Sequence, residues 1–308
     1  SFPTRRFSDL KKISEMRLTG ERALYKAKNL DISNSLFEDG ESPLKHSENI
    51  EISGTSFRYK YPLWHSNNVK VKDSVFFELG KSGIWYTDNL EFQNVQIDAP
   101  KEFRRCKNIK LENVVFTNAA ETLWTCDGIT LKNVQAKGDY FAMNSSNMKC
   151  ENFNLSGNYF FDGGKNIEVR NSRLISKDAF WNCENVTVYD SVIIGEYLGW
   201  NSKNLRFVNC TIESNQGLCY IDGLRLENCT LVNTDLAFEY CSNIDADTHG
   251  RILSVKNPIS GKIKADEIEE LFLDKTKIDP SKTEIICKKV GKINEDITDG
   301  NIFQEVTK

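Results

Sequence analysis

Acidic side chains with the spacing that sugar chemistry requires occur at related places in a repeated sequence. Glu121 and Asp139 lie in neighbouring copies of the repeat, and Asp178 lies in a later copy. A glycoside hydrolase needs two carboxyl groups about 5 to 10 Å apart, one protonated and one ionised. A polysaccharide lyase would instead combine a basic residue, such as Arg104, with a carboxylate or a metal. If the protein is an enzyme, we expect one of these two classes, with Glu121, Asp139 and Asp178 as the candidate catalytic residues.

All five tryptophans of the chain fall in one column of the repeat, four residues before a recurring asparagine. The residue before this column is apolar in nearly every copy, for example Leu63 and Ile84, so β-strand alternation would point the indoles outward. Exposed aromatic rings stack well against the C–H faces of sugars. We call this predicted surface the aromatic strip. Its candidate substrate-binding residues are Trp64, Trp85, Arg104, Trp124, Tyr140, Tyr159, Trp181, Tyr197 and Trp200. Three alternatives stay open: the C-terminal tail covers the strip, another chain covers it, or the corner of the coil turns the indoles inward.

The elements that carry these side chains are copies of a segment of 19 to 21 residues. One copy reads KNIEVRNSRL over residues 165–174, and it returns as ENVTVYDSVI at 184–193 and KNLRFVNCTI at 203–212. The first asparagine of the copy recurs at positions 147, 166, 185 and 204, in steps of 19. Repetition at a fixed period of this length is typical of a solenoid.

Each copy predicts a β-strand with one buried face. Ile167 and Val169 follow Asn166 by one and three positions, and the charged Glu168 lies between them. Successive copies that pair in parallel give an all-β, single-stranded parallel β-helix of about twelve coils, which we expect to be right-handed. A left-handed β-helix would show a hexapeptide period, and the five-residue period of a pentapeptide-repeat protein fails at its next step.

A second asparagine or aspartate follows five residues after the first, as Asn171 follows Asn166. Asparagine tolerates the left-handed backbone of a tight turn, and its amide both donates and accepts hydrogen bonds. We therefore expect both asparagine columns to form hydrogen-bonded ladders inside the corners of the coil.

The repeat also sets the expected domain organisation. Residues 1–10 closely resemble the translation of a sequencing adapter, so we expect them not to belong to the natural protein. Residues 11–286 form the predicted β-helix, in which the coils from about residue 245 lose the strict register and cap the open end. Residues 287–308 are predicted to be a polar tail.

Composition excludes several classes of partner. The formal net charge is −4, which disfavours nucleic acid, and no apolar run approaches the length of a membrane span. The nine cysteines are expected to pack as small apolar residues in the core, in a reducing cytoplasm. His46 and His65 are one copy apart without a third ligand, so we expect no metal and no cofactor. The sequence gives no indication of the oligomeric state.

Several longer phrases resemble one bacterial family. They include GERALY, YPLWHS, IWYTDNL, NAAETLW, DAFWNCENVTVYDSVI and GEYLGWNSKNLR, and they extend over residues 18 to about 286. Together they resemble the proteins that contain domain of unknown function 3737. The resemblance implies a pectin-lyase-like parallel β-helix. The family has no established activity, so the resemblance brings no catalytic residues with it.

Two functions follow as expectations. The first is carbohydrate binding or processing along the aromatic strip, with an oligosaccharide or polysaccharide as the partner. The alternative is a non-catalytic scaffold that uses the strip as a protein-interaction face.

Overall fold

The structure, a computed structural model, describes residues 10–294 and 303–304. The chain divides into two compact units, residues 1–141 (unit 1) and residues 142–308 (unit 2). Most of the predicted adapter segment, residues 1–9, lies outside the described residues, as do residues 295–302 and 305–308 of the predicted tail. Within the described part of the chain, no helix is long and apolar enough to cross a membrane.

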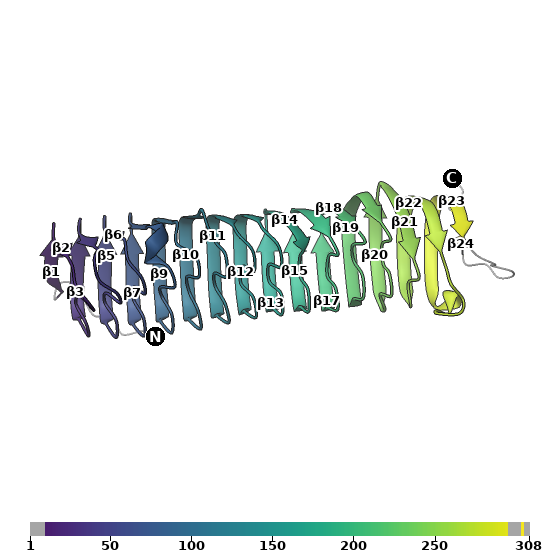
Figure 1. Ribbon diagram of the computed structural model, residues 1–308. Coiled ribbons are helices and arrows are strands. Elements are labelled where there is room, and N and C mark those ends of the chain that lie inside the picture. The colour runs from purple at the N-terminus through teal and green to yellow at the C-terminus, as the bar shows by residue number, and fades with distance from the viewer. Residues whose placement is uncertain (1–9, 295–302, 305–308) are drawn as a thin grey trace. The chain divides into compact units, whose positions relative to one another are not determined.

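Unit 1 is a parallel β-helix in which strands of successive coils pair in register (Figure 1). One stack contains β1 (Lys11–Ser14), β3 (Lys28–Ser33), β5 (Glu48–Ser53), β7 (Asn67–Lys72), β9 (Asp88–Ile97), β10 (Lys107–Phe116) and β11 (Asp127–Lys137). A second stack contains β2 (Arg17–Leu18), β4 (Leu36–Phe37), β6 (Ser56–Phe57) and β8 (Val75–Phe76), and it joins the second half of β9. The 3₁₀ turn η2 (Glu78–Gly80) follows β8.

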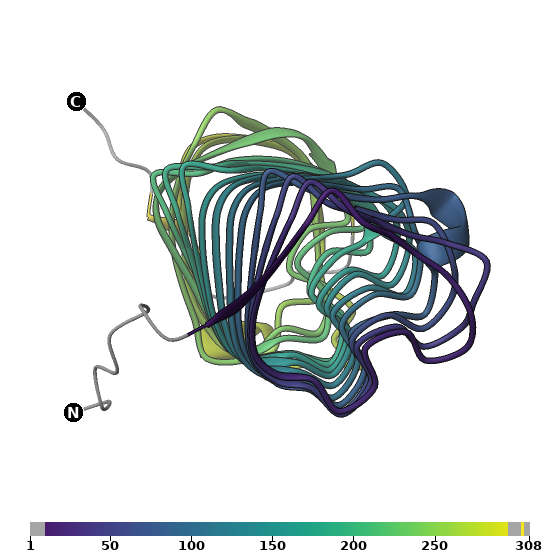
Figure 2. The same ribbon diagram turned by 90° about the vertical axis from the view of Figure 1, so that its left-hand side faces the viewer.

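Unit 2 repeats the same plan. One stack contains β12 (Ser146–Ser156), β13 (Lys165–Arg170), β15 (Glu184–Tyr189), β17 (Lys203–Val208), β19 (Asp222–Asp235), β20 (Ile244–His249), β22 (Gly261–Phe272) and β23 (Thr283–Asn294). A second stack contains β14 (Arg173–Asp178), β16 (Val192–Glu196) and β18 (Thr211–Asn215), and it joins the second half of β19. Strand β21 (Arg251–Lys256) pairs with the second half of β22. The turn η3 (Pro280–Lys282) precedes β23, and β24 (Phe303–Gln304) pairs with β23. Viewed from one end, the coils of each unit form nested closed loops (Figure 2).

The predicted parallel β-helix is confirmed, with about fifteen turns in place of about twelve. One additional turn precedes Asn29 and contains β1, and two follow Asn243 and contain β22 and β23, where the repeat loses its asparagine register but the strands continue to pair. Strand β23 extends to Asn294, so regular pairing continues past the predicted boundary at residue 286.

The core of both units follows the predicted alternation. In unit 1, Ile50 and Ile52 are buried on β5, while the side chain between them is half-buried. The rings of Phe37, Phe57 and Phe76 stack in successive coils, with centroids 4.9 and 4.5 Å apart. In unit 2 the corresponding inward positions are again apolar and buried. Each such side chain contributes about 1.5–3 kcal/mol by leaving water. All nine cysteines are free and buried, as core packing predicted.

The asparagine ladders exist, but they lie on the outside of the corners. Asn68 donates to Asn49 at 2.7 Å, and Asn209 donates to Asp190 at 3.0 Å, in both cases between exposed side chains. The predicted burial of the ladders is therefore wrong. A left-handed backbone alone does not set this direction, since Asn68 with φ of 54° is exposed and Ile84 with φ of 57° is buried. The polar amides avoid the cost of burial when they lie outside, where water can satisfy the groups that the ladder does not.

One side of each coil has an alternating backbone that the sequence did not predict. Ser82, Ile84 and Tyr86 have φ of 56°, 57° and 58°, and the residues between them do not. The N–H groups of Ser82 and Tyr86 donate to the following coil, to Pro100 and Arg104, while the N–H of Ile84 donates to the preceding coil. Because these three N–H groups all have backbone partners, the pairing offsets part of the strain of the left-handed residues.

Candidate functional site

In unit 1, the aromatic strip is a continuous stack of rings and cations. The indoles of Trp64 and Trp85 stack with centroids 5.0 Å apart and planes 10° apart. The Arg104 guanidinium lies between Trp85 and Trp124, at 4.4 and 4.5 Å from their ring centroids. Lys45 covers the outer face of this stack, with Nζ 5.5 Å from the Trp64 ring. Both faces of Trp85 are thus covered by side chains of its own unit.

The indole N–H groups of the strip are also satisfied within the coil. Trp64 donates to the Ser82 carbonyl at 2.6 Å, and Trp124 donates to the Tyr140 carbonyl at 2.6 Å. The tryptophans are half-buried, and the faces of Trp85 are covered by Trp64 and Arg104. The expected stacking of sugars on open indole faces therefore lacks its geometric basis in the middle of this stack.

The exposed column of side chains in unit 1 comes one residue after the tryptophan column, and the sequence did not predict its exposure. The rings of His46 and His65 stack at 5.0 Å, and those of His65 and Tyr86 stack at 4.8 Å. Arg105 completes the column, with its guanidinium carbon 6.0 Å from the Tyr86 centroid. Tyr86 is 39% exposed. Left-handed residues on both sides of the tryptophan column break the strand alternation, so the outward position moves by one residue.

Of the two carboxylate candidates in unit 1, Glu121 is held by two ion pairs. Glu121 lies 3.2 Å from Lys101 Nζ and 3.2 Å from Arg104 Nη2. Its backbone N–H donates to the carbonyl of Asp139 at 2.9 Å, so these two predicted residues do belong to neighbouring coils. Each carboxylate oxygen of Glu121 therefore has a cation of its own unit as a partner.

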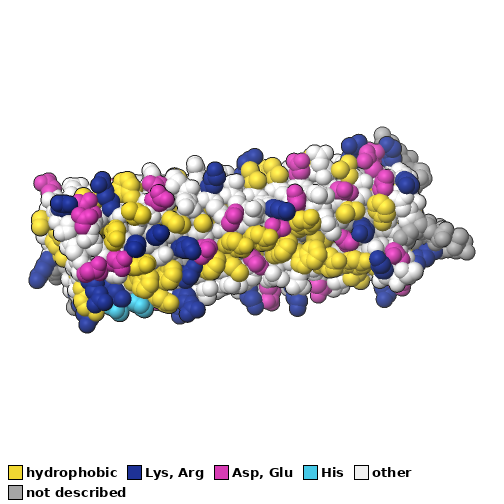
Figure 3. Space-filling model, in the orientation of Figure 1, with side chains coloured by type: hydrophobic (Ala, Val, Ile, Leu, Met, Phe, Trp, Pro, Cys, Tyr) yellow, Lys and Arg dark blue, Asp and Glu magenta, His cyan; other side chains and the backbone are white. Residues whose placement is uncertain are grey.

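Unit 2 brings together five of the predicted residues around one half-buried indole. Trp181 meets Tyr159 edge to face at 5.6 Å and Trp200 in a tilted contact at 5.8 Å. The Trp181 N–H donates to the Tyr197 carbonyl at 2.7 Å. Tyr159 in turn forms a side-chain hydrogen bond with Asp178. The space-filling view shows a run of hydrophobic side chains on one face of unit 2 (Figure 3).

Asp178 is the predicted residue with the most unusual environment. It is 2% exposed, and its Oδ2 has no hydrogen-bond partner among the described residues. Burial raises the pKa of this carboxyl, and the charge of Glu196 raises it further, while Lys177 and the Tyr159 hydrogen bond act in the opposite direction. A buried acceptor without a partner is costly, and such groups often have a functional explanation.

The backbone around Asp178 is locally irregular. Asp178 pairs with Glu196 of the next coil, across a register shift between β14 and β16. Lys177 and Glu196 form an exposed ion pair at 3.9 Å. Bulges of this kind re-aim side chains and recur next to active sites. The result is one buried carboxyl group, one exposed carboxylate and two aromatic rings at the same place.

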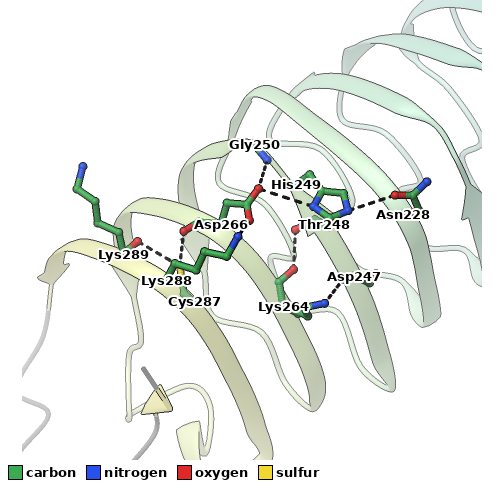
Figure 4. Close-up of polar contacts among 10 residues, drawn as sticks. All are labelled: Asn228, Asp247, Thr248, His249, Gly250, Lys264, Asp266, Cys287, Lys288 and Lys289. Carbon is green, nitrogen blue, oxygen red and sulfur yellow. Dashed lines mark hydrogen bonds and ion pairs between the residues drawn. The ribbon is translucent and has the colours of Figure 1, made fainter. Parts of the chain in front are cut away.

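A second polar cluster of unit 2 lies near its C-terminal end (Figure 4). Asp266 accepts hydrogen bonds from Lys288 Nζ at 2.7 Å and the Gly250 N–H at 3.0 Å, and it lies 3.7 Å from His249 Nδ1. His249 Nε2 is 3.2 Å from Asn228 Oδ1. The hydrogen bond from Lys288 lowers the pKa of Asp266. Asp266, Lys288 and His249 all have polar partners within the cluster. We therefore interpret it as a structural contact that joins β20, β22 and β23. Among the described residues, no group of three or more metal-binding side chains gathers at any point.

Comparison with solved structures finds other solenoids. A tailspike protein of E. coli bacteriophage HK620, in complex with a pentasaccharide, matches with a TM-score of 0.45 and 8% identity, over 96% of this chain and 73% of that chain. A mannuronan C-5 epimerase module of Azotobacter vinelandii matches with a TM-score of 0.31 and 8% identity, over 97% and 91%. A surface adhesin of Streptococcus pneumoniae matches with a TM-score of 0.38 and 10% identity, over 94% and 87%.

Among curated proteins, no sequence matches the chain. A family match covers most of it, from residue 11 to residue 286. The chain therefore belongs to the family described as Protein of unknown function (DUF3737).

Proposed function

We propose that the protein binds a saccharide at the cluster of Tyr159, Asp178, Trp181 and Glu196 in unit 2. The observation that carries this proposal is the buried Oδ2 of Asp178, an acceptor without a partner beside two aromatic rings. A sugar offers hydroxyl groups that donate to this acceptor once the Asp178 carboxyl turns toward the surface, and apolar C–H faces that pack against aromatic rings. Few other small ligands combine both properties on one rigid ring.

The surrounding groups support the same ligand. The Tyr159 hydroxyl holds Asp178 in place, and the hydrogen bond from Trp181 to the Tyr197 carbonyl fixes the indole. Side chains that are held before the ligand arrives lose little further entropy on binding. The exposed Lys177–Glu196 ion pair lies at the same coil and supplies further polar contacts.

The test compares oligosaccharide binding by wild type, Asp178→Asn and a matched control. A glycan array first identifies a ligand for the wild type, and calorimetry then measures its dissociation constant with each variant. Asp178→Asn keeps one acceptor for Tyr159 but presents an amide N–H₂ in place of the free oxygen. We expect it to lose about tenfold or more in affinity, because hydrogen bonds to charged groups contribute about 1.5–3 kcal/mol.

Asp245→Asn serves as the control, since it removes one carboxylate from an exposed position of β20 in the same unit. It should bind as the wild type does. Unchanged affinity of Asp178→Asn, with a ligand that the wild type binds, would overturn the assignment of this cluster.

One observation favours the alternative, a non-catalytic scaffold. In unit 1 the faces of Trp85 are covered by Trp64 and Arg104, as expected where aromatic side chains stabilise the solenoid itself. A correctly folded protein that binds no glycan on the array would support the scaffold. In either case we propose a reducing cytoplasm as the location, because all nine thiols are free.

A further inference from the structure

Unit 1 carries a second surface, separate from the Asp178 cluster, in which cations lie at both ends of a row of aromatic rings. We call it the basic aromatic face and define it as Lys26, Lys45, His46, His65, Tyr86 and Arg105. The histidine rings lie beside hydrophobic and basic side chains in the space-filling view (Figure 3). Its members come from successive coils, so they form a line along the coil axis of unit 1.

Backbone hydrogen bonds fix the spacing of this line. The N–H of Lys26 donates to Lys45 at 2.9 Å, His46 donates to Trp64 at 2.9 Å, and His65 donates to Trp85 at 2.9 Å. Tyr86 and Arg105 continue the pattern, with bonds of 2.8 and 2.9 Å to the next coil. The side chains of the face are therefore repeated at the coil spacing of about 4.8 Å.

The cations of the face are not neutralised by carboxylates. Within residues 10–294, Lys26, Lys45 and Arg105 contact aromatic rings and form no ion pair. Lys26 Nζ lies 5.2 Å from the Tyr25 ring centroid. The neighbouring Arg104 differs, since Glu121 neutralises it at 3.2 Å. The charges of Lys26, Lys45 and Arg105 are thus uncompensated within the described residues.

The histidines sit in the positive field of this face. His46 and His65 are both exposed, and their rings stack at 5.0 Å. Burial lowers the pKa of His65, and His46 and Lys45 lower it further. No carboxylate contributes to this shift, which agrees with an absence of acidic groups close to the ring.

We propose that the basic aromatic face binds an acidic polysaccharide, a chain whose sugars carry carboxylate or sulfate groups. Such a chain presents anionic groups at regular intervals along one edge and ring faces between them. This pattern complements a row of aromatic rings, spaced from coil to coil, with cations at both of its ends. Nucleic acid is the less suitable polyanion, because the whole chain has a net charge of −4 and a pI near 5.6.

The experiment measures binding of polygalacturonate, heparin, a neutral glucan and single-stranded DNA to the full chain. Surface-immobilised ligands at several salt concentrations give both affinity and its salt dependence. The test variant combines Lys26→Gln, Lys45→Gln and Arg105→Gln. The control combines Lys149→Gln, Arg173→Gln and Arg225→Gln, exposed positions of unit 2 with the same change in charge. Circular dichroism and thermal unfolding verify that both variants are folded.

We expect polygalacturonate, heparin or both to bind the wild type and the control, with an affinity that falls as salt rises. The test variant should lose about tenfold or more in affinity. Binding of only the uronate or only the sulfated chain would identify the acidic group. Absence of binding to both, equal losses in the test and control variants, or equally tight binding of DNA would overturn the proposal. Because Asp178→Asn leaves this face intact, the two proposed sites fail or succeed independently.

Discussion

The guanidinium carbon of Arg104 lies 4.4 Å from the centroid of the Trp85 indole, with the ring of Trp124 at 4.5 Å on its other side. Its Nη2 also contacts Glu121 at 3.2 Å, while its Nε is buried and has no partner in the described part of the chain. A cation above one aromatic face contributes about 0.5–2 kcal/mol. Arg104 is therefore a structural residue that ties three successive coils of unit 1 together through its side chain.

Replacement of Arg104 by Ala should lower the free energy of unfolding by about 2 kcal/mol, because two ring contacts and one ion pair are lost. The free energy of unfolding of Arg104→Lys should lie between those of wild type and Arg104→Ala, since a lysine keeps the charge but not the planar group that stacks. Urea unfolding of unit 1, followed by tryptophan fluorescence, provides the measurement. Arg105→Ala is the control, because it loses one exposed ring contact at 6.0 Å. Equal losses of stability for Arg104→Ala and Arg105→Ala would show that stacking of the Arg104 guanidinium on the indoles does not stabilise the fold.

The strands and the core could be predicted because they obey the two-residue period of a β-strand. Ile167 and Val169 are buried as their alternation with Glu168 indicates, and the same rule holds in every coil. The exposed column could not be predicted from that rule. Ile84 has a left-handed backbone with φ of 57°, a conformation that its residue type disfavours. The sequence around Ile84 therefore does not indicate this conformation.

The residues of the candidate site could be predicted from the sequence, but their arrangement could not. The aromatic column and Asp178 were identified because their residue types are unusual in the repeat. The pairing of Asp178 with Glu196 depends on a register shift between β14 and β16, which no residue type in either strand specifies. The burial of Asp178 likewise depends on packing between coils, and its unpaired Oδ2 became visible in the structure alone.

Glu102 is a buried acid within the core of unit 1, and it should make stability depend on pH. Its Oε1 accepts a hydrogen bond from the Gly83 N–H at 3.0 Å, and its Oε2 has no partner among the described residues. Burial raises the pKa of Glu102 well above its ordinary value. The unfolded chain ionises at a lower pH, near its ordinary pKa of about 4.3. The contribution of protonated Glu102 to the free energy of unfolding is thus fully present below about pH 4, and it is lost as pH rises toward the folded-state pKa.

Glu102→Gln should remove this part of the pH dependence. Each pH unit through which only the unfolded state is ionised lowers stability by about 1.4 kcal/mol, so the variant should be more stable than wild type at pH 7. At pH 4 the two should be alike. Chemical denaturation at both pH values tests this, with Glu91→Gln on β9 as an exposed control. Parallel pH profiles of wild type and Glu102→Gln would show that Glu102 is not held neutral.

Asn209 combines a ladder position with a left-handed backbone, so its two roles can be separated. It donates to Asp190 at 3.0 Å, accepts from Asn228 at 2.9 Å and has φ of 53°. Asn209→Gly loses the side-chain hydrogen bonds but keeps an easy left-handed conformation. Asn209→Ala loses both and should cost about 1 kcal/mol more than the glycine variant. Thermal unfolding of the two variants gives the difference, and an alanine variant as stable as the glycine variant would mean that the turn is not strained.

Trp181 tests whether the indoles of the strip are free binding platforms or parts of the fold. Its ring contacts Tyr159 and Trp200, and its N–H donates to the Tyr197 carbonyl at 2.7 Å. Trp181→Ala should therefore lower the free energy of unfolding by about 2–3 kcal/mol. Trp181→Phe keeps an apolar ring but leaves the carbonyl without its donor, and it should cost about 1 kcal/mol. Urea unfolding, with saccharide binding measured in parallel on each variant, distinguishes the two roles. Unchanged stability of Trp181→Ala would mean that the indole projects freely into solvent, as strand alternation alone had predicted, and the contacts with Tyr159 and Trp200 would then contribute nothing to the fold.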